Sequence, residues 1–262
     1  MRKTIYDFLF LLSFLTPIPV PREYVQNKLE FGSLFALPII GSMRGAFVSI
    51  PLLTICFFHI GSPDIAAFSV IAMHYVMQGF IHADGFIDFS EAALAKRFGA
   101  DARKVLKDRY RGSYAIAIFS IFSLWLYSAL LSIVITTNPL KAISLVVSAE
   151  AWSPTSMILT SLLSAEPPEG MGRAFKRGAD SKSAAISLII SSTITIFLFR
   201  EFRSSLFLIL LSFISILLSS AISSALGRRV LGYANGDVLG FSNELSYAVL
   251  LTSFVLGASP WI

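Results

Sequence analysis

Seven long apolar segments, separated by short charged ones, constrain this chain more than any other feature. We interpret them as spanning helices at about 31–60, 64–81, 114–136, 139–164, 184–200, 205–226 and 245–262. An apolar run of 18 or more residues can cross roughly 30 Å of hydrocarbon as a helix, because it satisfies its own backbone hydrogen bonds. Only 14% of the residues are charged, whereas a soluble domain needs about 25%. The sequence therefore predicts an all-α polytopic membrane helix bundle, one domain over 1–262, and disfavours a soluble bundle.

The first 30 residues differ from these spans. Met1-Arg2-Lys3 and the apolar run that follows are typical of the start of a secretory signal. Prolines at 17, 19 and 21, however, stand where a signal peptide would have the small residues of a cleavage site. We therefore predict a short N-terminal helix lying at the membrane interface.

The distribution of basic residues predicts the orientation. With the N-terminus inside and seven alternating spans, 17 of the 21 lysines and arginines fall on the cytoplasmic side and three outside. Cytoplasmic loops are enriched in these residues, so we expect the N-terminus inside and the C-terminus outside. The same loops account for the net charge of +5. No basic stretch interleaved with aromatic residues indicates a nucleic-acid partner.

Three carboxylates follow the second span. Asp84, Asp88 and Glu91 are spaced i, i+4, i+7, which places them on one stripe of a helix. Like charges side by side repel, and Mg²⁺ or Mn²⁺ would relieve the repulsion, since hard oxygen ligands suit these ions. The alternative is that the carboxylates solvate a helix end and balance nearby lysines. His82 is weaker as a site residue, because a lone histidine is more often a structural donor.

A basic segment beside Asp108 is the second candidate. Arg103, Lys107 and Arg111 fall on one face if the segment is helical, and such a face complements phosphate groups. A solvated cytoplasmic face would have the same pattern, and the sequence leaves both readings open.

A second acidic group precedes the last span. Asp237 and Glu244 are spaced i, i+7, and we expect both at the cytoplasmic mouth of that span. Gly236 and Gly240 would let a ligand or another backbone approach closely, although they equally suit helix caps. We expect Asp84 and Asp237 to form one site, although about 150 residues separate them.

Five motifs occur in an order and at separations that are characteristic of one family. They are Phe14-Leu15-Thr16-Pro17-Ile18-Pro19-Val20-Pro21, His82-Ala83-Asp84-Gly85-Phe86-Ile87-Asp88, Lys107-Asp108 with Arg111-Gly112, Gly170-Met171-Gly172, and Gly236-Asp237-Val238-Leu239-Gly240 with Glu244. Together they resemble the cobalamin synthase family, the adenosylcobinamide-GDP ribazoletransferases, from about residue 8 to about 250. The chain departs from the family at Glu91-Ala92, where the family usually continues with Asp-Gly.

The resemblance implies a membrane transferase that joins adenosylcobinamide-GDP to α-ribazole or α-ribazole 5′-phosphate. GMP leaves, and adenosylcobalamin or its 5′-phosphate forms. It implies a cytoplasmic site in the cell membrane, with Mg²⁺ (or Mn²⁺) and the lipid bilayer as further partners, and it is compatible with a homo-oligomer. The implied catalytic residues are Asp84, Asp88 and Asp237; the metal ligands are Asp84, Asp88, Glu91, Asp237 and Glu244; the substrate-binding residues are His82, Arg103, Lys107, Asp108, Arg111, Gly236 and Gly240.

Two other functions compete with this one. A CDP-alcohol phosphotransferase-like enzyme also carries aspartates at helical spacing beside a span, but its Asp-Gly-x-x-Ala-Arg pattern is absent here. A cation-coupled transporter would carry ionisable residues near the middle of the membrane. Only Arg44 and Glu150 lie deep within predicted spans, which makes a transporter the weaker hypothesis.

Overall fold

The computed structural model describes residues 2–24, 31–58, 60–108, 110 and 112–258. Every regular element in these ranges is a helix, which confirms the all-α prediction. Besides the short 3₁₀ helices η1 (Arg22–Tyr24) and η2 (Leu34–Ala36), the elements are α1 (Arg2–Leu15), α2 (Leu37–Val48), α3 (Ile50–Phe58), α4 (Pro63–Met77), α5 (Ile81–Arg97), α6 (Ala102–Lys107), α7 (Ser113–Thr136), α8 (Pro139–Leu162), α9 (Gly170–Gly178), α10 (Ser181–Leu198), α11 (Ser205–Val230) and α12 (Gly236–Ala258).

Six helical stretches of the described chain are long and apolar enough to cross a membrane. The bent pair α4–α5 makes seven if it counts as one span. The expected number of spans is therefore confirmed. The first stretch, Leu34–Phe58, joins η2, α2 and α3 across Ser49.

The second predicted span ends in a sharp bend. The axes of α4 and α5 differ by 93° across 78–80. Gly79 and Phe80 have φ values of 57° and 60°, so both lie in the left-handed region where a helix cannot continue. Beyond the bend, α5 continues to Arg97 and carries the acidic stripe on a helix, as the spacing predicts.

The last span begins earlier than predicted. We expected the span to start at about 245, with Asp237 and Glu244 at its mouth, but α12 starts at Gly236. Asn243 and Glu244 are fully buried within it. The predicted start was wrong because buried polar residues lower the hydropathy of a helical segment to the level of a loop. The hydrogen-bond partners that allow these residues to be buried come from other helices.

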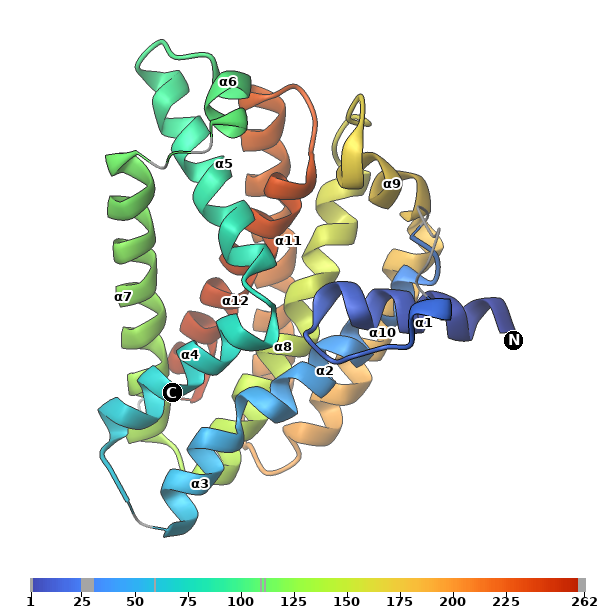
Figure 1. Cartoon of the computed structure of the whole chain (residues 1–262). Coiled ribbons are helices and arrows are strands. Elements are labelled where there is room, and N and C mark those ends of the chain that lie inside the picture. Colours follow the sequence, from blue (N-terminus) through green and yellow to red (C-terminus); the bar gives the residue numbers. More distant parts are fainter. Residues whose placement is uncertain (1, 25–30, 59, 109, 111, 259–262) are drawn as a thin grey trace.

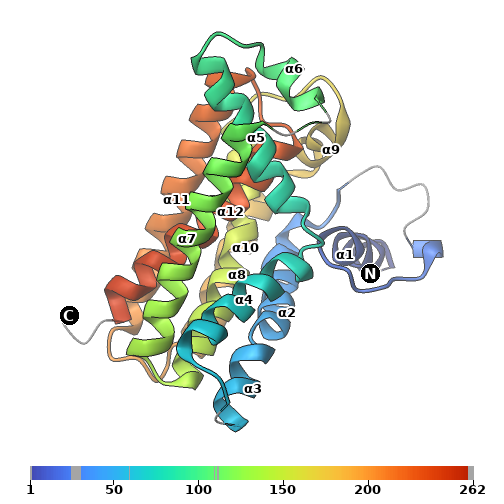
Figure 2. The same cartoon turned by 60° about the vertical axis from the view of Figure 1, so that its left-hand side comes forward.

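Helix α8 is the central element of the bundle. It packs against α2, α10, α11 and α12, and α12 in turn packs against α5. Small hydroxyl side chains connect these helices: Trp152 Nε1 donates to Thr195 Oγ1 at 2.7 Å, and the hydroxyls of Thr160 and Ser242 are 2.7 Å apart. Such contacts are common between helices in membranes, because small residues let backbones approach. Helix α7 packs against α4, α5 and α12 and stands at one side of the bundle (Figures 1 and 2).

Helix α1 lies across the long helices rather than parallel to them (Figure 1). Leu11 and Leu15 are buried, and Phe10 packs edge-on against Phe31, 5.3 Å between ring centroids. Its opposite face, including Ile5 and Tyr6, is exposed. This geometry fits the predicted interfacial helix.

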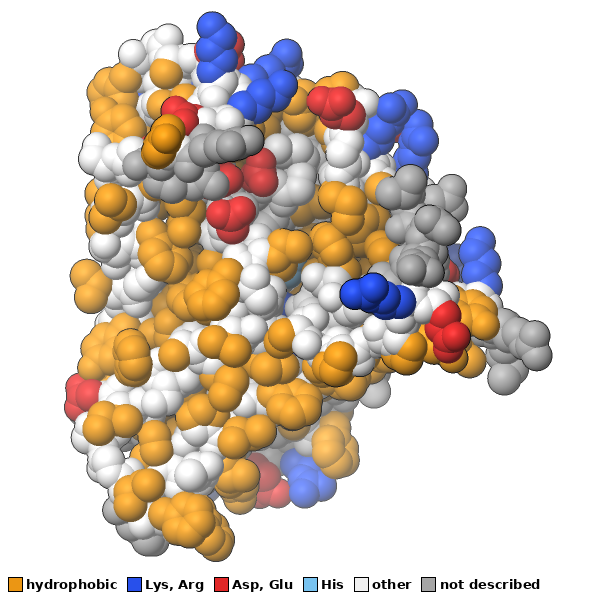
Figure 3. Space-filling view, in the orientation of Figure 1, with side chains coloured by type: hydrophobic (Ala, Val, Ile, Leu, Met, Phe, Trp, Pro, Cys, Tyr) orange, Lys and Arg blue, Asp and Glu red, His pale blue; other side chains and the backbone are white. Residues whose placement is uncertain are grey.

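The surface divides by side-chain type. Most of the Lys and Arg side chains of the face in Figure 3 lie at one end, over α6 and α9, and many hydrophobic side chains are spread over the surface below them. Such a belt with a basic end is typical of a membrane protein.

Candidate functional site

One cavity lies where three helices begin, and we call it the three-helix cavity. Its volume is about 230 Å³. The first turns of α5, α9 and α12 contribute Ile81, His82 and Asp84, Met171 and Gly172, and Gly236, Asp237 and Leu239, respectively. Phe14, Phe31, Met157 and Phe175 form an apolar wall. The cavity therefore combines helix N-termini, two carboxylates and an aromatic surface.

The three helix N-termini make this cavity suited to an anion. The first N–H groups of a helix have no partner within it, and the helix dipole adds about half a positive charge there. At α12, Asn235 Oδ1 accepts from the Val238 N–H at 3.1 Å, and Asn235 Nδ2 donates to Asp237 Oδ2 at 2.7 Å. Asn235 thus caps the helix and orients the Asp237 carboxylate.

Two glycines bring α5 and α12 into backbone contact at this cavity. A Cβ at Gly85 would lie 3.1 Å from the Cα of Asp237 and 3.3 Å from that of Gly240. A Cβ at Gly240 would lie 3.1 Å from the carbonyl oxygen of His82. The expected close approach at Gly240 is therefore confirmed. It also explains why Asp84 and Asp237 line one cavity, as we predicted from the sequence.

Gly236 differs from Gly240, because a Cβ there would meet nothing within 4 Å. It lines the cavity, so the open space belongs to the candidate site. Gly172 has a third role: a Cβ there would lie 2.7 Å from the Cα of Asn235. The Gly-x-Gly turn thus fits α9 against the start of α12.

The other two acids of the stripe occupy successive turns of α5. Asp88 is buried. Glu91 Oε1 accepts from the Gly112 N–H at 2.7 Å and so fastens the start of α7 to α5. Among the described residues, no group of three or more His, Cys, Asp or Glu side chains is arranged to hold a metal ion. Asp84 and Asp237 are the carboxylates that share the cavity, and the metal roles of all the predicted ligands stay predictions.

The predicted basic face is shorter than expected. Helix α6 ends at Lys107, because Asp108 has an extended ψ of 135° and its Oδ1 accepts from the Tyr110 N–H at 3.0 Å. The single helical face through Arg103, Lys107 and Arg111 was therefore wrong, and Arg111 itself lies outside the described residues. Lys107 is exposed at the end of α6.

Arg103 contacts the loop that leads into α12. Its Nη2 donates to the Leu231 carbonyl at 3.3 Å, and its guanidinium lies 5.7 Å from the centre of the Tyr233 ring. These contacts hold α6 beside the segment that ends at Asn235. The phosphate-binding roles of Arg103, Lys107 and Asp108 stay predictions.

Glu244 is not at the mouth of the last span. It is fully buried, and its Oε2 lies 3.3 Å from His74 Nε2. The expected cytoplasmic position was wrong because α12 begins eight residues earlier, which puts Glu244 roughly 12 Å along the helix at about 1.5 Å per residue. Its predicted place in the metal cluster is not supported by this position.

Glu244 instead belongs to a buried polar network from α2, α4, α8 and α12. Arg44 Nε donates to Glu150 Oε2 at 2.6 Å, and the other oxygen of Glu150 contacts His74 Nδ1. The Gln78 amide lies 2.7 Å from His74 Nε2. Tyr247 stacks on His74, with 4.0 Å between ring centroids. The network is built from two basic and two acidic side chains, so its formal charges can balance.

His74 and Gln78 were not predicted from the sequence. Arg44 and Glu150 stand out in it as ionisable residues inside spans, which are expensive without partners. That signal could have prompted a search for further polar residues in neighbouring spans, and His74 lies in one. Which helices are neighbours, however, is information that only the structure supplies.

His82 lies between the network and the cavity. Its side chain is buried and lines the cavity, and Nε2 has no hydrogen-bond partner among the described residues. A buried imidazole nitrogen without a partner is costly, so a bound molecule in the cavity would supply the missing hydrogen bond.

The segment before α9 is held by ionic contacts. Glu166 Oε1 accepts from Arg173 Nε at 2.7 Å and from Arg177 Nε at 3.2 Å. The hydrogen bond from Arg173 holds the pKa of Glu166 below its usual range. Lys176 Nζ donates to the Ser161 carbonyl at 2.5 Å, near the end of α8. These contacts fix α9 and therefore the third wall of the cavity.

Comparison with known proteins gives one consistent result. A family model described as cobalamin-5-phosphate synthase matches residues 7–255. An adenosylcobinamide-GDP ribazoletransferase of Halorubrum lacusprofundi is 28% identical over 253 residues, which is 94% of this chain and 95% of the relative. The protein of the same name from Clostridium tetani is 28% identical over 258 residues, 97% of each chain. That of Archaeoglobus fulgidus is 25% identical over 245 residues, 94% of this chain and 95% of the relative. No solved structure matches the chain.

Proposed function

This chain belongs to the cobalamin-5-phosphate synthase family, and from that premise we propose that it joins adenosylcobinamide-GDP to α-ribazole or α-ribazole 5′-phosphate with release of GMP. The product is adenosylcobalamin or its 5′-phosphate. The observation that carries the proposal is the three-helix cavity. His82 and Asp84 of one family motif and Gly236 and Asp237 of another line the same space there.

The cavity suits the diphosphate of the GDP-linked substrate. Helix N-termini bind phosphate groups through their unpaired N–H groups and the helix dipole, and three of them converge here. Gly236 leaves open space at the α12 terminus, which lets phosphate oxygens approach the backbone. As the bond to GMP breaks, charge grows on the leaving oxygen, and fixed N–H dipoles stabilise it without reorganising.

Asp84 and Asp237 would hold Mg²⁺, or Mn²⁺, at this cavity. The donors fit the ion, because Mg²⁺ prefers one or two carboxylates together with substrate phosphates. When bound, the ion would neutralise charge on the diphosphate. Asp88, one turn further along α5, completes the proposed catalytic set, in which Asp237 or Asp88 takes the proton of the attacking hydroxyl.

The remaining lining gives the substrates a place and an orientation. Phe14, Phe31, Met157 and Phe175 offer an apolar wall to the non-phosphate parts of the substrates, and His82 offers an imidazole nitrogen to a polar group. Arg103 and Lys107 would attract the phosphates from the cytoplasmic side.

We place the protein in the cell membrane with its N-terminus and its active site in the cytoplasm, supported by the charge distribution of the loops. Single cysteines in a Cys56→Ser background test this orientation. A cysteine at Lys104 should be shielded from an impermeant thiol reagent in intact cells, whereas one at Asn138 should be labelled. The reverse pattern would overturn the orientation.

The activity is tested by measuring GMP release from adenosylcobinamide-GDP by purified protein with α-ribazole 5′-phosphate and Mg²⁺. Turnover of Asp84→Asn should be lower by at least about 100-fold, because the metal ion that Asp84 would hold lowers the energy of the charged transition state by several kcal/mol. Asp101→Asn is the matched control: Asp101 caps α6 and is exposed. Absence of GMP release by the folded wild-type protein, or equal losses in both variants, would refute the proposal.

A further inference from the structure

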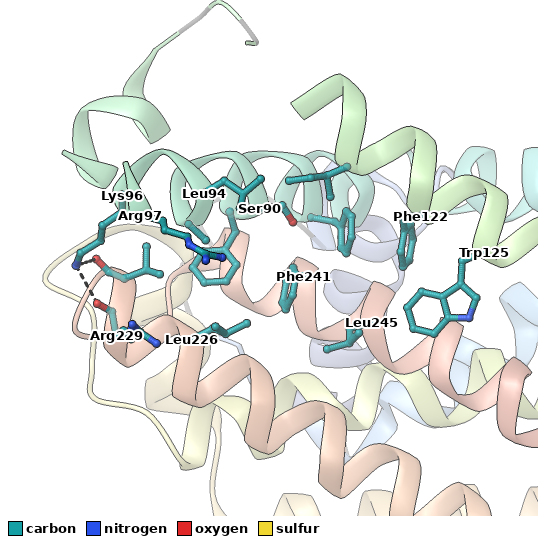
Figure 4. Close-up of a pocket in the computed structure, with 15 residues that line it drawn as sticks. Ser90, Leu94, Lys96, Arg97, Phe122, Trp125, Leu226, Arg229, Phe241 and Leu245 are labelled. Atoms are coloured by element: carbon teal, nitrogen blue, oxygen red, sulfur yellow. Dashed lines mark hydrogen bonds between the residues drawn. The ribbon is translucent and has the colours of Figure 1, made fainter. Parts of the chain in front are cut away.

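A large groove lies on the opposite face of α5 from the three-helix cavity and takes no part in the proposed reaction. Its volume is about 930 Å³. We call it the α5–α7 groove; its apolar lining includes Phe86 and Phe89 of α5, Phe122 and Trp125 of α7, Leu226 of α11 and Leu245 of α12 (Figure 4). At 3.6 residues per turn, the side of α5 that carries Phe86 points away from Asp84 and Asp88.

The walls of the groove are aromatic and packed. The Phe86 ring stacks on Phe122 with 4.0 Å between centroids and on Phe241 with 5.2 Å. Trp125 lies at the end furthest from the basic residues (Figure 4), and its Nε1 donates to Thr252 Oγ1 at 2.8 Å. With its indole N–H satisfied, Trp125 presents an apolar ring to the groove.

The other end of the groove is basic. Lys96 Nζ donates to the carbonyls of Arg229 and Val230 at 2.8 Å and 2.7 Å, which satisfies the C-terminal end of α11 (Figure 4). Within the described chain, the side chains of Arg97 and Arg229 have no hydrogen bond or ion pair. No acidic side chain is among the described residues that line the groove. Two guanidinium groups are therefore left for a ligand of opposite charge.

The rims of the groove indicate that it faces lipid. Two of the helices that form it carry exposed apolar side chains outside the groove lining: Ile121 on α7, and Leu218 and Ile222 on α11. The apolar surface of α11 runs from Leu206 to Leu226, about 30 Å at 1.5 Å per residue, which is the thickness of the hydrocarbon core.

The basic end therefore falls at the level of lipid headgroups, since Arg229 lies one turn beyond the apolar surface of α11. From Phe86 to Arg97 the groove follows α5 for about 16 Å, the depth of one leaflet. The groove thus has the length, polarity and position of a single lipid chain with its headgroup.

We propose that the α5–α7 groove binds an anionic phospholipid, with an acyl chain along the aromatic wall and the headgroup phosphate between Arg97 and Arg229. Arginine suits this role because its planar fork donates two hydrogen bonds to phosphate. The bound lipid packs against α5 on the face opposite Asp84 and Asp88.

Tryptophan quenching tests the site directly. The protein is placed in phosphatidylcholine vesicles that contain a small fraction of either phosphatidylglycerol or phosphatidylcholine with the same brominated acyl chains. The fluorescence of Trp125 is obtained as the difference in emission between the wild-type protein and Trp125→Phe. Brominated phosphatidylglycerol should quench it more strongly than brominated phosphatidylcholine. Arg97→Gln and Arg229→Gln should each lower this preference about fivefold, because one basic residue near the membrane surface has an effect of that size.

Arg228→Gln is the matched control, because Arg228 is an exposed neighbour on α11 that does not line the groove. It should keep the full preference. Equal quenching by the two brominated lipids, or the same loss in Arg228→Gln and Arg229→Gln, would overturn the proposal. Relief of quenching by excess soluble glycerol 3-phosphate would assign the arginines to a free phosphate ester and would also overturn it. The readout is binding alone, so it is independent of transferase activity.

Discussion

Replacing Gly240 by alanine tests the contact that unites the two halves of the site. The new Cβ would lie 3.1 Å from the His82 carbonyl oxygen and 3.3 Å from the Cα atoms of His82 and Gly85. These neighbours are backbone atoms of α5, so no side-chain rotation can relieve the contact. Helix α5 must instead move away from α12 by a few tenths of an ångström.

Two opposing effects set the size of the stability change. Overpacking a tight contact costs about 1–3 kcal/mol. Alanine inside a helix is about 1 kcal/mol more favourable than glycine, which offsets part of that cost. The net destabilisation is about 1 kcal/mol, which corresponds to a fall in melting temperature of roughly 2–4 °C for a chain of this size. Turnover should fall about several-fold, because a misplacement of about 1 Å between reacting groups can cost 100-fold and the shift here is a few tenths of that.

Gly236→Ala is the matched control for the stability measurement, four residues earlier on the same helix. Its Cβ meets nothing within 4 Å, and its φ is not in the left-handed region, so the melting temperature should stay unchanged or rise slightly. The assays are thermal unfolding in detergent and GMP release at saturating substrate. A Gly240→Ala protein with wild-type turnover would refute the idea that this contact sets the spacing of Asp84 and Asp237.

Three further predictions concern acidic residues. Asp84→Asn and Asp237→Asn should be non-additive in turnover, with a coupling of about 1–3 kcal/mol; additive losses would place them in separate sites. Glu150→Gln should cost about 3–5 kcal/mol in thermal unfolding by leaving Arg44 unpaired, whereas an equal loss in Glu166→Gln at the surface would contradict that cause. Asp180→Ala should cost about 1 kcal/mol as a lost helix cap. The hydrogen bond from the Ser183 N–H holds the pKa of Asp180 below its usual 3.8. The stabilisation by the charged cap is therefore complete above pH 3.8 and is lost as the pH falls through the pKa of Asp180 in the folded protein. If Asp180→Ala destabilised the protein equally in acid, the charged cap would be excluded.

The sequence predicted the features that depend on local spacing. Apolar runs predicted helices, and the spacing of Asp84 and Asp88 predicted an acidic stripe on α5, because both follow from helical periodicity alone. It failed where tertiary partners decide the outcome. Glu244 lowers the hydropathy of its segment. Its contact with His74 on another helix is what allows its carboxylate to be buried within a helix.

The buried network explains why the chain can bend where the site begins. Gly79 and Phe80 both adopt left-handed backbone, which is uncommon for a residue with a side chain such as Phe80. A bend of this kind persists only when its surroundings hold it. His74, in the last turn of α4, is fixed between Glu150 and Glu244, and Gln78 at the end of that helix contacts it. The network therefore anchors the end of α4, and through the bend it sets where the first turn of α5 enters the cavity. On this reasoning, a membrane protein retains expensive buried charges here because they position a site that they do not touch.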